Sequence, residues 1–283
     1  MSVICNERQV QKIVIGHIGG FAWPTIILFF LCIAIYAFCM YRLVFDHVFS
    51  MWVFFGVTFC AYVVYTPLHD AVHGAVTGMK PEHRWINEWV GFISAHVLGI
   101  SFVSHRRTHL KHHRSTNHPE EDPDMVLAAK APAQLIAIWF KALPKEWMFS
   151  ASFQQFSKSE LRLVQLELAA IVLTRLLLII LCADLSITLC TLLVGHVIGN
   201  AILVTLFAWS VHHPHSEQKR MKTTTIYQAR GWLDIPLTLL WGFQNYHAIH
   251  HLFPKVPFFR YRILYQNLEG YLKAKDIPTR YLF

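Results

Sequence analysis

The stretch from residue 49 to residue 73 reads FSMWVFFGVTFCAYVVYTPLHDAVH, an apolar run that ends in a box with two histidines, His69 and His73. A helix needs about 20 predominantly apolar residues to cross the hydrocarbon core of a bilayer. The part at about 49–67 approaches that length. Because His69 and His73 lie four positions apart, one helical turn places both imidazoles on the same face. The stretch therefore predicts a membrane span that delivers two metal ligands near the membrane surface.

Further apolar runs predict an all-α integral membrane protein. With 54% hydrophobic and 15% charged residues and a mean hydropathy of +0.38, the chain is too apolar for an ordinary soluble domain. The sequence shows no internal repeat or linker, so we expect one domain over residues 1–283. A weaker stretch at about 85–103 contains polar residues and is expected to be interfacial or re-entrant. The four spans are expected at about 21–43, 49–67, 163–182 and 186–208.

The distribution of basic residues predicts the orientation. Lys and Arg accumulate on the cytoplasmic side of membrane proteins, and the short links at about 44–48 and 183–185 contain neither. We therefore expect both termini in the cytoplasm, in a bacterial inner membrane or a membrane of endoplasmic reticulum type. Topogenic residues facing anionic lipid headgroups explain the net charge of +8. No motif that reads nucleic acid accompanies this charge, so we expect no nucleic-acid partner.

Eleven of the 18 histidines fall into four short boxes, which we expect on the cytoplasmic side, partly on short helices that cap the spans. Imidazole is a good ligand for iron, copper, zinc and nickel. In HLKHH and HAIHH the first histidine pairs with the later ones at three and four positions, so each doublet can serve two neighbouring metals. This pattern predicts a dimetal site. The histidines of the boxes are His69, His73, His109, His112, His113, His212, His213, His215, His247, His250 and His251.

Several polar residues outside this set have competing interpretations. His105 lies one turn before His109 and could extend its box, but its SHRRTH setting also fits a solvated basic face. His196 lies in the fourth expected span, where a histidine bonded to a neighbouring helix or part of a path is more typical than a metal ligand. Asp70 could accept a hydrogen bond from a ligand ring. Five histidines are isolated from the boxes: His17, His47, His83, His96 and His118.

Over about residues 60–265 the chain resembles the membrane fatty acid desaturase superfamily. The resemblance rests on HDAVH, on HLKHHRSTN with the following PEEDPD, and on QNYHAIHHLFP with the following VPFFRY. Three boxes in this order are highly specific for the superfamily. TNHPEEDPD and QNYHAIHHLFPKVPFFRY also look like the related carotenoid ring hydroxylases. WSVHHPH looks like the fourth histidine position of that branch.

The resemblance implies a non-haem diiron oxygenase that uses O2 and two electrons to remove hydrogen from, or hydroxylate, an unactivated C–H bond of a lipid. We expect fatty acyl desaturation, with carotenoid ring hydroxylation or ketolation as the alternative. Within WSVHHPH, His212 is the expected ligand, and His213 and His215 are less favoured. Carried over by position, the iron ligands would be His69, His73, His109, His112, His113, His212, His247, His250 and His251.

The electron donor is expected to be a separate protein, such as a ferredoxin or cytochrome b5. Members of the superfamily can carry a fused cytochrome b5 with an HPGG motif. The nearest match here, His17-Ile18-Gly19-Gly20, lacks the proline and runs into the first span. Basic residues near the boxes form a candidate docking surface for an acidic donor. These are Arg106, Arg107, Lys111, Arg114, Lys219, Arg220 and Lys222.

Two functions of other classes fit the sequence less well. A zinc membrane hydrolase would also use histidines, but the chain has no HExxH motif and no glutamate placed as a base within a box. A metal transporter would place polar ligands near mid-bilayer, where only His196, Arg175 and Glu167 are candidates.

Residues 68–162 and 209–283 are predicted to face the cytoplasm because they contain basic residues that the short links lack. A cysteine introduced at Lys130 or Lys273 should therefore resist an impermeant thiol reagent in intact cells and react after lysis. A cysteine introduced at Asp46 or Asp184 is the matched control and should react from outside. Strong external labelling at Lys130 or Lys273 would overturn the orientation.

Overall fold

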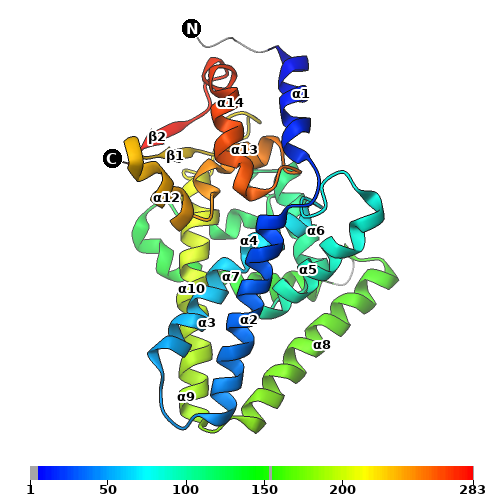
Figure 1. Ribbon diagram of the computed structural model, residues 1–283, viewed down its shortest axis with the longest axis vertical. Coiled ribbons are helices and arrows are strands. Elements are labelled where there is room, and N and C mark those ends of the chain that lie inside the picture. The colour runs from blue at the N-terminus through cyan, green and yellow to red at the C-terminus, as the bar shows by residue number, and fades with distance from the viewer. Residues whose placement is uncertain (1–5, 153–154, 283) are drawn as a thin grey trace.

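The computed structural model describes residues 6–152 and 155–282 of the chain, and confirms the all-α membrane fold (Figure 1). Four helices are long and apolar enough to cross a membrane, and they lie close to the expected ranges. The second and fourth spans continue further than predicted, so that His69 and His212 are in their last helical turns. The spans are Trp23–Phe45, Met51–Val72, Lys158–Leu181 and Leu185–His212.

Two spans are single helices and two are divided. The divided fourth span contains two π-helical segments, a local irregularity that is frequent at functional sites. At Gly199 in this span, an added Cβ would lie 2.6 Å from that of Ala61, so a small residue lets the two divided spans approach closely. The helices are α2 (Trp23–Phe45), α3 (Met51–Val63), α4 (Tyr65–Val72), α8 (Lys158–Leu181), α9 (Leu185–Leu189), the π-helical η5 (Cys190–Val194), α10 (Gly195–Leu203), the π-helical η6 (Val204–Trp209) and α11 (Ser210–His212).

The expected interfacial or re-entrant stretch is one arm of a sharply bent pair. Helix α5 (Arg84–Leu98) and helix α6 (Phe102–Arg114) meet at an angle of 98°. The left-handed conformation of Gly99, with φ at +77°, ends α5. Helix α6 then carries the HLKHH box. The turn between the two helices therefore decides where three of the predicted ligands lie.

Helix α8 satisfies the backbone groups that this turn leaves free. The Glu167 carboxylate accepts hydrogen bonds from the backbone N–H groups of Phe102 at 3.1 Å and Val103 at 3.4 Å. Two turns further along α8, the Arg175 guanidinium donates to the carbonyls of His96 at 3.1 Å and Val97 at 3.2 Å. An acid at a helix start and a cation at a helix end are both favoured by the helix dipoles. We call these contacts the α8 clasp.

The remaining elements lie beside and beyond the ends of α4 and α11, and α1, α13 and α14 form a cap over the spans (Figure 1). The two strands pair in parallel, with Ile226 opposite Thr279. The helices are α1 (Glu7–Ile18), α7 (Leu135–Ser150), α12 (Asp234–Leu240), α13 (His247–Leu252) and α14 (Tyr261–Ala274), and the strands are β1 (Ile226–Gln228) and β2 (Thr279–Tyr281). Short 3-10 turns cover Pro81–His83, Pro123–Leu127, Pro132–Gln134, Gly231–Leu233, Gln244–Tyr246 and Phe258–Arg260.

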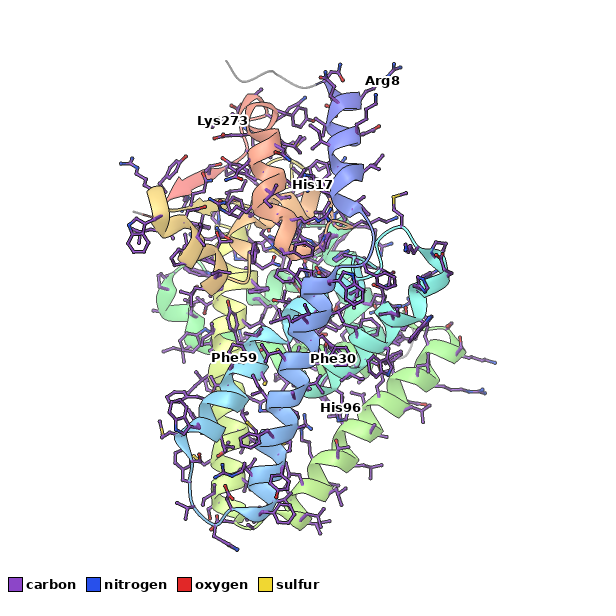
Figure 2. All side chains as sticks on the ribbon, viewed as in Figure 1. Arg8, His17, Phe30, Phe59, His96 and Lys273 are labelled. Carbon is purple, nitrogen blue, oxygen red and sulfur yellow. The ribbon has the colours of Figure 1, made fainter. Side chains whose placement is uncertain are left out.

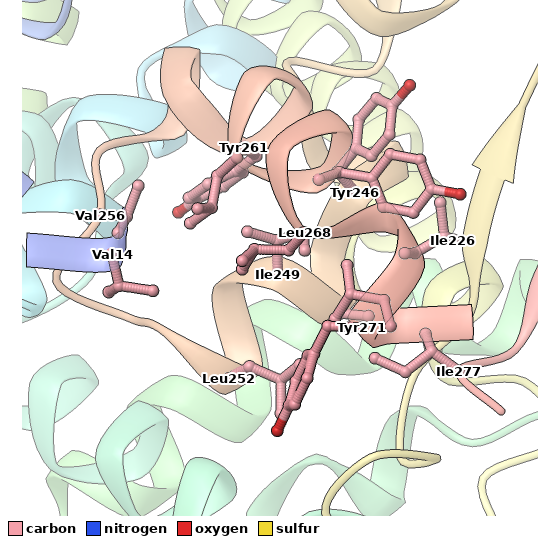
Figure 3. Packing of buried hydrophobic residues seen from close by; sticks show 14 of the residues in the cluster. Val14, Ile226, Tyr246, Ile249, Leu252, Val256, Tyr261, Leu268, Tyr271 and Ile277 are labelled. Atoms are coloured by element: carbon pink, nitrogen blue, oxygen red, sulfur yellow. The ribbon is translucent and has the colours of Figure 1, made fainter. Parts of the chain in front are cut away.

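The cap has its own hydrophobic core, which fixes α13 and its HAIHH box. Ile249 of α13 is fully buried and packs among Val14 of α1, Leu268 of α14 and Ile226 of β1 (Figure 3). Arg8 and Lys273 lie at the cap end of the molecule, whereas Phe30 and Phe59 lie on the spans (Figure 2). The exposed apolar side chains of the spans mark the surface that contacts lipid.

Removing the Glu167 carboxylate should destabilise the fold. Glu167→Leu leaves the N–H groups of Phe102 and Val103 without their acceptor, which costs roughly 1–3 kcal/mol for each buried group. We expect a lower midpoint of thermal unfolding in detergent. Glu217→Leu, which removes an exposed carboxylate, is the control and should melt like the wild type. Equal midpoints for all three proteins would show that the clasp contributes nothing.

Candidate metal centre

The nine histidines favoured by the sequence converge from four separate segments of the chain. Helix α4 and the residue after it supply His69 and His73, α6 supplies three, α11 supplies His212, and α13 supplies three. Nitrogen atoms of His69, His73, His109, His113 and His250 all lie within 4.8 Å of one another, and those of His112, His212 and His251 form a second such group. His247 adjoins the second group, since its Nε2 lies 3.1 Å from that of His251.

The spacing of the imidazole nitrogens fits shared metal ions. Nε2 of His113 lies 2.8 Å from Nε2 of His250 and 3.1 Å from Nε2 of His109. Two nitrogens bound about 2.1 Å from one metal at a right angle lie roughly 3.0 Å apart. Moreover, both ring nitrogens of His69 and Nδ1 of His212 are buried without a hydrogen-bond partner within the described residues. Buried polar atoms are normally satisfied, so this donor set fits a pair of metal ions.

Groups outside the histidines hold several rings by Nδ1 and leave Nε2 facing inward. Asp122 lies 2.8 Å from Nδ1 of His112, Gln244 lies 2.6 Å from Nδ1 of His247, and the Tyr261 hydroxyl lies 3.0 Å from Nδ1 of His250. Such contacts fix the tautomer and orientation of a metal-binding ring. The sequence analysis did not single out these three residues. They were nonetheless within the quoted motifs, Asp122 in PEEDPD, Gln244 in QNYHAIHH and Tyr261 in VPFFRY.

The environment keeps most of these imidazoles neutral, as metal binding requires. Burial, followed by the charge of neighbouring histidines, lowers the pKa well below its usual value for six of those that lie outside the spans. His112 differs: burial alone would lower its pKa, but the carboxylates of Asp124 and Asp122 raise it overall. The six histidines outside the spans with a lowered pKa are His73, His109, His113, His247, His250 and His251.

His105 takes part in a buried ion-pair chain and lies outside both histidine groups. Its Nδ1 lies 3.3 Å from a Glu146 oxygen. The Lys145 ammonium lies 3.1 Å from the other oxygen of Glu146 and 2.5 Å from an oxygen of Asp124, so it links the two carboxylates. Coulombic attraction outweighs burial here, so the pKa of Asp124 is lowered and that of Lys145 is raised. His105 is therefore a neighbour of the centre that pairs with a carboxylate.

The other two histidines of HHPH also lie outside the groups. The ring of His213 faces Trp209, with 5.2 Å between the ring centres. His215 is buried, and its ring centre is 6.1 Å from that of His212. Of the three, only His212 approaches the other predicted ligands.

Polar residues of the spans have structural partners. The expectation that Asp70 accepts a hydrogen bond from a ligand ring is wrong. Its carboxylate accepts one from the Thr25 hydroxyl at 2.7 Å and one from the backbone N–H of Phe258 at 3.2 Å. It therefore ties α4 to α2 and to the cap, because a buried carboxylate needs donors. His196 lies 3.3 Å from the Val97 carbonyl, so it bonds to a neighbouring helix as expected.

A cavity of about 510 Å³ leads from the histidines into the spans. Its upper end is lined by His69, His109, His112, His212 and His247. From there it continues between α3, α7, α8 and the fourth span, with mainly apolar walls. Ligand sites commonly combine such walls with a few placed polar groups. The cavity can hold a long apolar molecule with one part against the histidines.

His212 and His213 allow a test by adjacent substitutions. His212→Ala removes an imidazole from the second group, so the metal content of the purified protein should fall to roughly half. His213→Ala should retain the wild-type metal content, because its ring faces Trp209. Metal analysis of the two variants after equal expression measures the difference. The reverse result would show that the ninth ligand is assigned wrongly.

Comparison with known protein families agrees with the site. The chain matches the family model described as fatty acid desaturase over residues 47–283. No individual curated protein matches it. The matched segment contains all four histidine boxes and three of the four spans. It covers most of the chain, and the structure brings its boxes together at the end of an apolar cavity. The chain belongs to the fatty acid desaturase family and is a membrane oxidoreductase.

Proposed function

We propose that this protein is an O2-dependent diiron oxidoreductase that desaturates a long apolar lipid chain, a fatty acyl chain in the first instance. The cavity carries the proposal, because it combines histidines at one end with apolar walls along the spans. An unactivated C–H bond offers no charge or polarity to recognise. Its oxidation therefore depends on holding one carbon against the oxidising centre.

The two histidine groups correspond to two iron positions. His69, His73, His109, His113 and His250 would hold one ion. The second ion would be held by His112, His212, His247 and His251. Nine ligands exceed what one ion can use, which supports a pair over a single metal.

When bound, the iron pair would supply the oxidant formed from O2 and two electrons. Desaturation then balances as R–CH2–CH2–R′ + O2 + 2e⁻ + 2H⁺ → R–CH=CH–R′ + 2H2O. Asp122, Gln244 and Tyr261 hold the ligand rings in place, and the apolar walls exclude water from the reacting carbon. Trp139 and Phe207 contribute to these walls.

Carotenoid ring hydroxylation or ketolation is the second candidate function, and one observation favours it. Arg175 and Asn200 line the cavity away from the histidines. The methyl end of an ordinary acyl chain gains nothing from such polar groups, whereas a carotenoid that already carries an oxygen group can bond to them. Hydroxylation needs the same input as desaturation and balances as RH + O2 + 2e⁻ + 2H⁺ → ROH + H2O.

The two electrons would come from a separate donor, such as a ferredoxin or cytochrome b5, that docks on the cytoplasmic face. Arg106 and Arg107 pair with Glu88 and Glu160, so they are less available than predicted. The exposed Arg114, Lys219 and Arg220 remain for contact with an acidic partner. The cytoplasmic orientation of this face is part of the proposal.

The purified protein should contain about two iron ions per chain, because two histidine groups can each bind one. His73→Ala, His112→Ala and His250→Ala should each lower the iron content and abolish activity while the protein still inserts. His83→Ala and His118→Ala, outside both groups, are the controls. Stoichiometric zinc without iron in an active preparation would refute the diiron proposal.

The reaction itself is tested by lipid and pigment analysis of a host that expresses the chain. New double bonds in acyl chains would support desaturation. Oxygenated carotenoid in a carotenoid-producing host, with unchanged acyl chains, would support the second candidate. If neither product depends on His112, both functions are wrong.

A further inference from the structure

The part of the cavity that lies within the spans contains polar groups that the proposed chemistry does not use. Arg175 of α8 and Asn200 of α10 line it, among apolar neighbours such as Ile179, Leu192 and Val197. Both residues belong to membrane spans. A charged side chain within a span is costly and commonly marks a functional site.

Both side chains keep hydrogen-bonding capacity that the described residues leave unused. Arginine has five N–H donors. The hydrogen bonds of Arg175 run from Nη2 to the two carbonyls of the α8 clasp, its guanidinium lies 5.7 Å from the centre of the Tyr36 ring, and it pairs with no carboxylate within 6–152 and 155–282. Asn200 donates from Nδ2 to the Trp139 carbonyl at 3.1 Å. Its carbonyl oxygen makes no hydrogen bond with the described residues. Together they offer donors and one acceptor to a ligand.

The position of these groups sets where they would contact a substrate. Asn200 precedes His212 by twelve residues on one continuous span. At 1.5 Å per residue this corresponds to roughly 18 Å along the helix axis. A chain that extends about this far from its reacting carbon at the histidines would therefore end beside Asn200, while the cavity continues along the span to Leu192 and Leu189. Arg175 lies at a similar depth, because it bonds to the same Val97 carbonyl that His196 approaches, one turn before Asn200.

We propose that Arg175 and Asn200 form a binding site for an oxygen-bearing group at the far end of the substrate. The substrate class is then a long apolar chain that is oxygenated at its remote end, as a hydroxyl, carbonyl or carboxylate. A methyl end would leave the remaining N–H groups of the guanidinium without acceptors. An oxygen there accepts from Arg175, and a hydroxyl also donates to Asn200. This inference rests on the proposed function, which places the reacting carbon at the histidines.

Binding to the purified protein in detergent tests the site without requiring turnover. The probes are a linear alkane, a primary alcohol and a fatty acid of matched chain length, which present a methyl, a hydroxyl or a carboxylate as the end group and carry no other oxygen; the alkane is the methyl probe. Each competes with a brominated chain that quenches tryptophan fluorescence, because Trp139 and Trp147 line the cavity. The wild type should bind at least one far-end oxygenated probe about tenfold more tightly than the methyl probe. The hydroxyl and carboxylate arms show which oxygen group is recognised.

In Asn200→Leu and in Arg175→Gln, the ratio of the affinity for the oxygenated probe to that for the methyl probe should fall towards one. Ile198→Leu is the matched control: it is on the same helix, 40% exposed, and should keep the wild-type preference. If the three probes bind the wild type equally, the inference is wrong. It is also wrong if both variants keep the preference. Should a variant fail to fold, the comparison of probes on the wild type still decides.

Failure of the proposed function would be distinguishable from failure of this site. Iron content and lipid products are measured on the same preparations. A protein that prefers the oxygenated probes but contains no iron would contradict the diiron proposal and retain the far-end site. A protein that contains two iron ions and forms the expected product, but binds all probes equally, would support the proposed function and contradict the binding site at Arg175 and Asn200.

Discussion

The break between α5 and α6 imposes the constraint on which the metal centre depends. Ser101 and Phe102 of this turn are buried, and buried backbone groups have no water to bond, so other parts of the protein must satisfy them. Glu167 and Arg175 meet this need from one face of α8. The same contacts set the start of α6, which carries His109, His112 and His113 at one end of the bundle. A long lipid-facing helix thereby positions predicted ligands that it does not itself contribute.

The histidines converge because two spans and two short helices each place histidines at the same end of the bundle. The second span carries His69 in its last turn and the fourth span ends at His212, while α6 and α13 lie beyond the span ends. The packed cap holds α13 through Ile249 and its neighbours. Burial keeps the rings neutral, and partners at Nδ1 orient them. The site is therefore rigid through contacts that lie outside the histidines.

The cavity links this polar centre to an apolar interior. Near the histidines it is bordered by the Asp124, Lys145 and Glu146 ion pairs, and further along by hydrocarbon side chains. A cavity that is polar at one end and apolar along the rest suits a substrate that is oxidised at one position and only bound elsewhere. Arg175 and Asn200 interrupt the apolar wall, which makes them a means of selecting among long chains of similar shape.

The sequence by itself determined the span positions to within a few residues, the all-α class, the family and the nine converging histidines. Hydrophobic length and helical spacing are local properties, so they can be read without a fold. Only the tertiary structure decided that His69 lies within the second span, that Asp70 bonds to Thr25 and Phe258, and that His105 pairs with Glu146. It also decided that Glu167 and Arg175 clasp the α5–α6 turn. These contacts join residues distant in the chain, and burial together with hydrogen-bond satisfaction selects their partners only once the helices have packed.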